Sequence, residues 1–283
     1  MGDVGIVLVG GRSSRMGAPK AGLEWHGSTL LRRTVGVLRR AVDGPVIIVR
    51  APDQAVPETP DDVLIVDDDQ EGLGPLQGLA VGLEAAAAHG EVAFVCSTDL
   101  PFLHPAYIRR ILAGFDEDTD VVLPMVHGHR QPLAAGYRTS LAAEVQRLLA
   151  DGARKPAMLF EVVRTRRLDE DALLSDPVLA AADPALRSVL NINDPDDYAR
   201  ARAAAPPTVD VRCFGTLARS GGYDGHDGRP VAAATLEGAA RAVGISLDQH
   251  VVAALNGDRI TRDGHTPLMD GDRVSLLSAD AGG

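Results

Sequence analysis

The stretch LVGGRSSRMGAPK, residues 8–20, decides the fold, and it begins inside the apolar run Val4–Val9. Glycines at this position let backbone N–H groups approach phosphate oxygens closely, while Arg12, Arg15 and Lys20 can neutralise the phosphate charge. The spacing differs from those of the P-loop and the dinucleotide-binding fingerprint. A simple strand-to-helix turn with surface arginines is the alternative. Three glycines, two serines and three cations within thirteen residues favour a phosphate-binding loop.

Apolar, β-branched runs alternate with helical patterns through the first two hundred residues. The expected strands are Val4–Val9, Val46–Val49, Val63–Val66, Val92–Ser97 and Val121–Pro124. The expected helices are Leu30–Val42, Leu76–His89, Ala106–Phe115 and Leu141–Leu149. This alternation predicts an α/β fold with a mostly parallel sheet and helices on both faces. Its loops then meet at the carboxyl edge of the sheet, where such folds bind ligands.

A second domain is expected after the proline pair in residues 204–207, which we interpret as a linker between domains 1–203 and 208–283. The expected elements of the second domain are strand Val209–Phe214, helix Leu236–Val243, the hairpin strands Val251–Leu255 and Arg259–Thr261, and strand Arg273–Leu277. Asn256-Gly257 is a strong signal for the hairpin turn. Mixed strands wrapped on one helix predict an α+β grasp. The stretch Asp169–Arg187 suggests a helical insertion.

Composition narrows the classes of function. The net charge of −11 argues against a nucleic-acid or anionic-membrane surface. The chain shows neither a signal peptide nor an apolar run of membrane-spanning length, so we expect a cytoplasmic protein. Cys96 and Cys213 form no metal or redox spacing. The chain has 28 Lys plus Arg residues, of which only Lys20 and Lys155 are lysines. Such a composition suggests that arginine cannot replace lysine at these two positions. Two lysines could also be left by chance.

Two carboxylates follow expected strands. Asp99 comes just after Val92–Ser97 and could hold Mg²⁺ or cap a helix before Pro101. The phosphate-binding loop favours the metal, because phosphoryl transfer needs a cation to neutralise developing charge. Asp67 follows the third strand and belongs to an acidic triplet, a pattern more typical of a solvated loop.

Residues 8–23 resemble the signature of the molybdenum cofactor guanylyltransferases, L-A-G-G-x-S-x-R-M-G-x-x-K-x-x-L, within the wider group of Rossmann-like nucleotidyltransferases. The chain departs from this pattern only at Val9, which replaces alanine. The resemblance implies that Lys20 contacts the triphosphate and that Asp99 is the magnesium ligand. The other implied nucleotide-contacting residues are Leu8, Val9, Gly10, Gly11 and Asp67, with Arg15 stabilising phosphate charge.

The resemblance extends to two further segments. Gly128–Leu133 is similar to a family stretch that faces the acceptor, which implicates Gln131 and Pro132. Asn191 and Asn193 fall on the asparagines of a family segment N-x-N-T-P-x-D, in which Asp194 replaces the threonine. This segment would equally form an Asx-turn that caps a following helix. The chain also lacks the asparagine that the family often has after the second strand.

Residues 208–283 resemble the β-grasp (ubiquitin-like) sulfur carriers, either the molybdopterin synthase small subunit or the thiamine sulfur carrier. The likeness covers the V-x-x-x-L-N-G hairpin, the segment P-L-x-D-G-D-R-V and the terminal Gly282-Gly283. It implies that the carboxylate of Gly283 is adenylated and converted to a thiocarboxylate. The implied partners are an adenylating enzyme and the large subunit of molybdopterin synthase. The alternative interpretation is that the two glycines are a frayed tail on an unrelated domain.

These resemblances predict an enzyme that transfers GMP from GTP to molybdopterin or the molybdenum cofactor, with Mg²⁺ as cofactor and pyrophosphate as product. The segment Gly74–Leu79, G-P-L-x-G-L, resembles the family's nucleoside-side segment, and this resemblance implies guanine rather than cytosine. Transfer from CTP, or to another phosphorylated acceptor, remains an alternative. So does a non-enzymatic sulfur carrier whose front domain only recruits partners.

Overall fold

The computed structural model describes residues 2–9, 19–68, 74–220, 228–257 and 259–278. The chain divides into two compact units. Unit 1 comprises Met1–Leu23 and Leu30–Tyr198, and unit 2 comprises Glu24–Thr29 and Ala199–Gly283. The chain therefore passes between the units three times, because the short segment Glu24–Thr29 belongs to unit 2 while both of its neighbours belong to unit 1.

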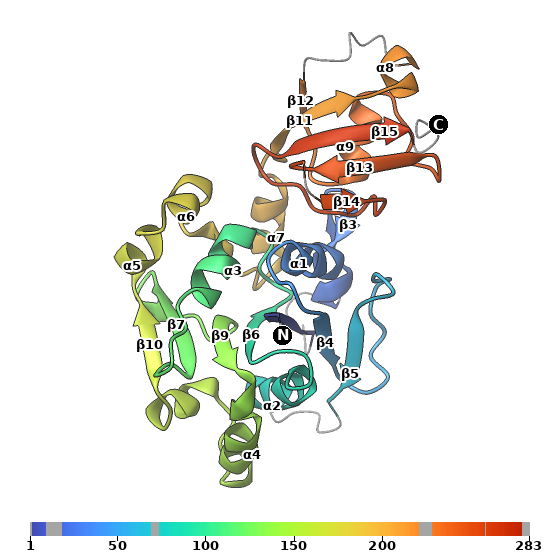
Figure 1. Cartoon of the computed structure of the whole chain (residues 1–283). Coiled ribbons are helices and arrows are strands. Elements are labelled where there is room, and N and C mark those ends of the chain that lie inside the picture. The colour runs from blue at the N-terminus through green and yellow to red at the C-terminus, as the bar shows by residue number, and fades with distance from the viewer. Residues whose placement is uncertain (1, 10–18, 69–73, 221–227, 258, 279–283) are drawn as a thin grey trace. The chain divides into compact units, whose positions relative to one another are not determined.

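A mostly parallel sheet forms the centre of unit 1, as predicted (Figure 1). Its strands are β1 (Val4–Leu8), β4 (Val46–Arg50), β5 (Leu64–Asp67), β6 (Val92–Ser97), β7 (Val121–Val126), β8 (His129–Arg130), β9 (Ala134–Arg138) and β10 (Thr165–Leu168). The strand order is β10-β7-β9-β6-β1-β4-β5, with β8 paired to β7. β9 runs antiparallel to both of its neighbours, whereas β6, β1, β4 and β5 run parallel.

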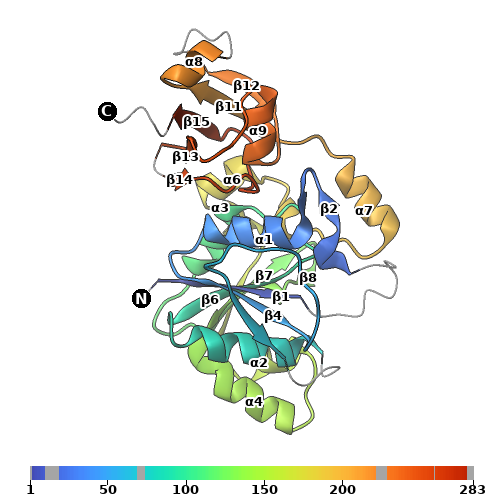
Figure 2. The same cartoon turned by 90° about the vertical axis from the view of Figure 1, so that its right-hand side faces the viewer.

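Helices cover both faces of this sheet. On one face lie α1 (Leu30–Arg39) and α3 (Pro105–Leu112), and on the other lie α2 (Pro75–Ala86) and α4 (Ala142–Ala150) (Figure 2). The short helices α5 (Glu170–Leu174) and α6 (Pro177–Ala182) follow β10, and α7 (Pro195–Arg202) carries the chain from unit 1 into unit 2. None of the helices in the described residues is long and apolar enough to cross a membrane.

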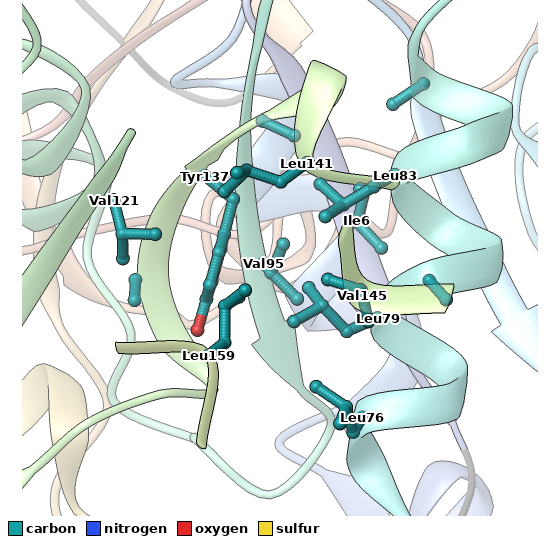
Figure 3. Packing of buried hydrophobic residues seen from close by; sticks show 14 of the residues in the cluster. Ile6, Leu76, Leu79, Leu83, Val95, Val121, Tyr137, Leu141, Val145 and Leu159 are labelled. Atoms are coloured by element: carbon teal, nitrogen blue, oxygen red, sulfur yellow. The ribbon is translucent and has the colours of Figure 1, made fainter. Parts of the chain in front are cut away.

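The core between the sheet and α2 is close-packed (Figure 3). Leu79 and Leu83 of α2 pack with Ile6 of β1 and Val95 of β6, all fully buried. Gly82 permits this approach, because an added Cβ would lie only 2.8 Å from the Ile6 Cγ2 atom. The tightly packed helix α2 therefore holds β1 and β6, whose ends form part of the carboxyl edge of the sheet, in place from one face of the sheet.

The strand order reverses beside β1. From β1 the chain proceeds through α1 to β4 and on to β5, and then returns through α2 to β6 on the opposite side of β1. Leu8 at the end of β1 is in register with Val49 of β4 and Ser97 of β6, so these strands end at one level. Ligands of open α/β sheets bind where the order reverses in this way.

Unit 2 contains a five-stranded mixed sheet. Its strands are β11 (Thr208–Cys213), β12 (Arg229–Ala232), β13 (Val251–Leu255), β14 (Arg259–Thr261) and β15 (Arg273–Ser278), in the order β12-β11-β15-β13-β14. β11 and β15 are parallel, and the other pairs are antiparallel. The helices are α8 (Thr216–Ser220) and α9 (Leu236–Ala242), and α9 packs its buried side on the sheet. A hairpin of β2 (Glu24–Trp25) and β3 (Ser28–Thr29) belongs to the same unit.

The predicted Asn-Gly hairpin between β13 and β14 is present, with positive φ at Asn256 (57°) and Gly257 (93°). The turn is tied to the start of β15 by Asp272, which is 5% exposed. Its carboxylate accepts a hydrogen bond from the Asn256 side-chain amide at 2.9 Å and one from the Met269 backbone N–H at 2.7 Å. Asp272 thus joins the buried backbone of its own turn to the exposed turn between β13 and β14.

Six strands of the described residues were not expected from the sequence: the two-residue strands β2, β3 and β8, and the longer strands β9, β10 and β12. β9 contains Gly136, which weakens the strand signal but is required by packing, since an added Cβ would lie 2.7 Å from the Phe115 ring. β10 is a polar strand at the sheet edge, and β12 carries Pro230, a residue confined to edge strands. The stretch predicted as one helical insertion forms two short helices, because Asp169 and Asp176 each cap a new helix.

Candidate active site

Lys20 and Asp99 form the centre of the candidate site. Lys20 opens a short 3₁₀ turn, Lys20–Gly22, and Asp99 lies two residues beyond the end of β6. The Lys20 Nζ atom is 3.0 Å from the Asp99 Oδ2 atom, although the residues are 79 positions apart. Their side chains are 19% and 21% exposed, so the pair is accessible to a ligand without being fully solvated. The cation and the carboxylate expected at this edge therefore lie side by side.

A third segment joins the pair. The Lys20 Nζ atom also donates to the Ile192 carbonyl oxygen at 2.6 Å, and the Ile192 N–H donates to the Asp99 carbonyl oxygen at 2.9 Å. Ile192 is buried and lies between the exposed Asn191 and Asn193. The asparagine segment is therefore fixed next to the ion pair by main-chain hydrogen bonds.

The other carboxylate oxygen of Asp99 is occupied by Ser97, whose hydroxyl donates to Oδ1. The loop after Asp99 is held by Arg33 of α1, whose Nε atom donates to the Pro101 carbonyl oxygen at 2.6 Å. Burial, together with repulsion from Arg40, lowers the pKa of Arg33 to about 10, so the guanidinium remains charged near neutral pH. Asp99 is thus placed by contacts from β6, α1 and the Ile192 segment.

Asp67 lies at the same edge of the sheet, at the end of β5. The Arg50 Nε atom donates to the Asp67 Oδ1 atom at 2.7 Å, and Asp67 is 44% exposed. Gln54, which the sequence did not indicate, accepts the Ala51 N–H and donates its side-chain amide to the Val9 carbonyl oxygen at 3.0 Å. The ends of β1, β4 and β5 are therefore tied together on one side of Asp99.

Two of the expected acceptor residues, Gln131 and Pro132, lie on the other side of Asp99. The Ser97 N–H donates to the Leu133 carbonyl oxygen at 3.3 Å, which places the turn before β9 against the end of β6. Within this turn, the Tyr137 hydroxyl donates to the Pro132 carbonyl oxygen at 2.7 Å, and the Gln131 amide makes a long contact of 3.4 Å with the Val126 carbonyl oxygen. The structure therefore brings Gln131 and Pro132 to the edge where Asp99 lies.

The asparagine segment also caps α7. The Asp194 side chain accepts the Asp197 N–H at 2.8 Å, and the Asp197 side chain accepts the Asn193 N–H at 3.0 Å. This is the Asx-type turn allowed by the sequence, and it leaves the exposed Asn193 side chain outside the cap.

Leu8, Val9, Lys20, Asp67 and Asp99 are all within the described residues, at the carboxyl edge of unit 1. Gly10, Gly11 and Arg15 of the glycine-rich loop, and Gly283 at the end of the chain, lie outside the described residues.

The residues present fit a magnesium ion that enters with a nucleotide. In the part of the chain that the structure describes, no three His, Cys, Asp or Glu side chains form a ready metal site. Asp99 offers a single partly exposed carboxylate. Mg²⁺ is commonly held by one or two carboxylates together with substrate phosphates and water. The donor set therefore suits a cation whose other ligands come from a triphosphate.

Cys96 precedes Ser97 but does not offer a nucleophile. Its side chain is fully buried. Burial, reinforced by the nearby Asp99 carboxylate, raises the pKa of the Cys96 thiol far above its usual value. The thiol therefore stays protonated and acts as a small apolar side chain.

The sequence profile of the MobA-like NTP transferase domain matches residues 5–168, more than half of the chain. The chain belongs to this family. The match includes β1, Lys20, β6 and Asp99, so the ion pair lies within the transferase domain. The chain is accordingly a nucleotidyltransferase enzyme.

Relatives of this transferase include a protein of Mycobacterium avium named "Probable molybdenum cofactor guanylyltransferase", which is 42% identical over 161 residues, covering 56% of this chain and 80% of the relative. A protein of the same name from Mycobacterium tuberculosis is 40% identical over 168 residues, covering 58% of this chain and 82% of the relative. Each of these two alignments covers more than half of this chain.

The solved structures support the fold. Molybdopterin-guanine dinucleotide biosynthesis protein A from Archaeoglobus fulgidus superposes with a TM-score of 0.54 at 24% identity, covering 70% of this chain and 96% of that one. A 2-C-methyl-D-erythritol 4-phosphate cytidylyltransferase from Thermus thermophilus gives a TM-score of 0.51 at 19% identity, covering 71% and 98%. Unit 1 therefore has the Rossmann-like nucleotidyltransferase fold.

Proposed function

We propose that the enzyme transfers GMP from GTP to molybdopterin or the molybdenum cofactor and releases pyrophosphate. The names of the relatives at 40–42% identity support this choice of base and acceptor. The observation that carries the proposal is the Lys20–Asp99 pair, 3.0 Å apart, where the strand order of the sheet reverses.

The order of the residues along the sheet edge supports a transfer between two substrates. Asp67 ends β5, Val9 follows β1, Asp99 follows β6, and Leu133 precedes β9. These four strands and β4 lie in the order β5-β4-β1-β6-β9. Val9 and Asp67, proposed to contact the nucleotide, are thus on one side of Asp99, and Gln131 and Pro132, proposed to contact the acceptor, are on the other. This arrangement suits an α-phosphorus located near Asp99, between a leaving pyrophosphate and an incoming phosphate.

The chemistry needs few side chains. An oxygen of the acceptor's terminal phosphate forms a bond to the α-phosphorus, and the bond from the α-phosphorus to the bridging oxygen breaks, so that pyrophosphate leaves with the electron pair. A phosphate dianion needs no general base near neutral pH. Lys20 would neutralise charge on the triphosphate, and Asp99 would hold Mg²⁺. When bound, the ion supplies charge neutralisation at the phosphates.

The direct experiment incubates the purified enzyme with molybdopterin, Mg²⁺ and each NTP in turn, and identifies the products by mass spectrometry. We expect the guanine dinucleotide and pyrophosphate from GTP, and no product when EDTA removes the cation. Selective use of CTP would reject the guanylyl assignment while preserving the transferase. Absence of product with every NTP would reject molybdopterin as the acceptor.

We further propose that unit 2 is a β-grasp sulfur carrier. The support is its strand order, β12-β11-β15-β13-β14, with a parallel central pair and one packed helix, together with the Gly-Gly at the end of the sequence. Its partners would be an adenylating enzyme and the large subunit of molybdopterin synthase. Incubation with ATP, sulfide and an adenylating enzyme of the sulfur-carrier class should convert the Gly283 carboxylate first to an acyl-adenylate, with release of pyrophosphate, and then to a thiocarboxylate, with release of AMP. Intact mass detects the product.

Removal of Gly282 and Gly283 provides the control for the carrier proposal. The shortened chain should lose sulfur loading and keep nucleotidyl transfer. Sulfur loading that survives this deletion would show that the terminal carboxylate of Gly283 is not the acceptor.

A further inference from the structure

We propose that Lys20 couples nucleotide binding to cation binding: it blocks the Asp99 carboxylate in the free enzyme and is drawn away by the triphosphate, which makes the carboxylate available to the cation. This inference rests on the proposed use of an NTP with Mg²⁺. It adds to that function an interaction within the protein that must be broken before the cation can bind well.

The first support is that both oxygens of Asp99 have partners. Oδ2 accepts from the Lys20 ammonium at 3.0 Å, and Oδ1 accepts from the Ser97 hydroxyl. A Mg²⁺ ion bound to a carboxylate oxygen at about 2.1 Å would lie within roughly 3–5 Å of an ammonium held by the same oxygen. Two like charges at that separation repel strongly in a partly buried site. The free enzyme should therefore bind a divalent cation poorly.

The second support is that Lys20 is held by two acceptors and not by the carboxylate alone. Its ammonium also donates to the Ile192 carbonyl oxygen at 2.6 Å. Neutralisation of Asp99 by a cation would not by itself release Lys20, because the carbonyl remains as an acceptor. A triphosphate offers the ammonium several charged oxygens in exchange for one carboxylate and one carbonyl. The nucleotide is therefore the ligand that can move Lys20.

The third support is that a preformed all-protein cation site is absent from the described residues. The cation must take most of its ligands from phosphate and water, so it gains little from binding before the nucleotide. Thermodynamic linkage then requires the reverse effect of equal size: the cation must strengthen nucleotide binding by the factor with which the nucleotide strengthens cation binding.

The first test measures Mn²⁺ binding by electron paramagnetic resonance, without nucleotide, for the unaltered enzyme, Lys20→Met and Lys155→Met. Lys155 is the only other lysine of the chain and is exposed, so its variant removes the same side chain without touching Asp99. We expect Lys20→Met to bind Mn²⁺ about ten-fold more tightly and Lys155→Met to match the unaltered enzyme. Equal affinity in all three proteins would overturn the proposal.

The second test observes Lys20 directly, since loss of a positive charge could strengthen cation binding without any blocking contact. Enzyme labelled with ¹³C and ¹⁵N at the lysine side-chain termini should give two NMR signals, and Lys155→Met assigns them. We expect the Lys20 signal to shift in Asp99→Asn, to remain nearly unchanged with Mg²⁺ alone, and to shift with GTP plus Mg²⁺. If the chemical shift of the Lys20 signal is the same in Asp99→Asn as in the unaltered enzyme, the two side chains do not form an ion pair in solution.

The two tests separate this inference from the proposed function. If GTP is turned over but Lys20 shows no pairing with Asp99, the coupling is wrong and the transferase assignment stands. If the Lys20 signal responds to Asp99→Asn but not to GTP with Mg²⁺, while another NTP shifts it, the coupling stands and the choice of GTP is wrong. Thermal unfolding of Lys20→Met and Asp99→Asn checks that both variants remain folded.

Discussion

Two aspartates, one in each unit, use their carboxylates in opposite ways. Asp272 of unit 2 is 5% exposed and accepts hydrogen bonds from the Met269 backbone N–H in its own turn and from the Asn256 side chain in the turn between β13 and β14. Asp99 of unit 1 is about one-fifth exposed, and its main partner is an ammonium 79 residues away in the sequence. A carboxylate that satisfies neighbouring backbone donors stabilises a turn, whereas one paired with a distant, movable cation at a sheet edge is available to a ligand.

The largest expected effect is on catalysis. Asp99→Ala should lower nucleotidyl transfer by on the order of 10³-fold, because the carboxylate that we propose as the ligand of the neutralising cation is lost. Its thermal unfolding should change little, since Asp99 is partly exposed and its partners can turn to solvent. Pyrophosphate release and calorimetry provide the two measurements. An unchanged rate of transfer would show that Asp99 takes no part in the mechanism. The contrast between a ligand-binding Asp99 and a structural Asp272 would then be wrong.

Asp272→Ala should show the opposite pattern. We expect unit 2 to lose about 2–4 kcal/mol of unfolding free energy, because the buried Met269 N–H and the Asn256 side-chain amide lose a charged acceptor. Trp25, the only tryptophan of the chain, is buried and belongs to unit 2, so we expect its fluorescence to report on this unit during urea unfolding. Nucleotidyl transfer should persist under conditions in which the protein stays folded. A transition of unaltered midpoint would show that Asp272 is not a structural acceptor.

A smaller effect is expected where α2 supports the sheet edge. Gly82→Ala should destabilise unit 1 by about 1–3 kcal/mol, because the added methyl group would lie 2.8 Å from the Ile6 side chain. Gly78→Ala, one helical turn earlier, is the matched control: its Cβ would meet Leu8 at 3.6 Å, an ordinary contact. The control should be neutral or stabilising by up to about 1 kcal/mol, as expected for alanine in a helix. Chemical unfolding of both variants measures the difference.

The smallest effect concerns an exposed ion pair of unit 2. Burial opposes ionisation of Glu24, but hydrogen bonds from the Gly27 N–H and the Arg202 guanidinium outweigh it and hold the pKa of Glu24 below its usual value. A depressed pKa stabilises the fold above the unfolded pKa, near 4.3, and this contribution is lost as the pH falls through the folded pKa. Because the side chain is half exposed, Glu24→Gln should cost less than about 1 kcal/mol at pH 7.

The pH dependence is the check on Glu24. The difference in unfolding free energy between Glu24→Gln and the unaltered protein, followed by Trp25 fluorescence, should disappear at a pH below the folded pKa. A difference in unfolding free energy that persists at this pH would show that the contribution of Glu24 does not depend on its negative charge.

Much of unit 1 could be predicted because its strands are continuous apolar runs and its helices have a clear apolar face. The missed strands had no such signal: β9 is built from small residues around Gly136, and β10 is polar. Lys20 and Asp99 were identified because their residue types and positions after strands carry chemical meaning. The role of Ile192 could not be predicted, since a backbone carbonyl 172 residues from Lys20 leaves no trace in the sequence pattern. Ser97 and Gln54 also act through contacts that only the fold creates.

The interleaving of the two units has a consequence for how such proteins can be rearranged. The hairpin Glu24–Thr29 begins four positions after Lys20 yet belongs to the same compact unit as residues 199–283. Ending a gene at the proline pair would leave this hairpin behind without the rest of its unit. Recombination that exchanges residues 199–283 for another carboxyl-terminal module would have to exchange this six-residue insert as well, or leave a mismatched segment that begins four positions after Lys20 in the sequence.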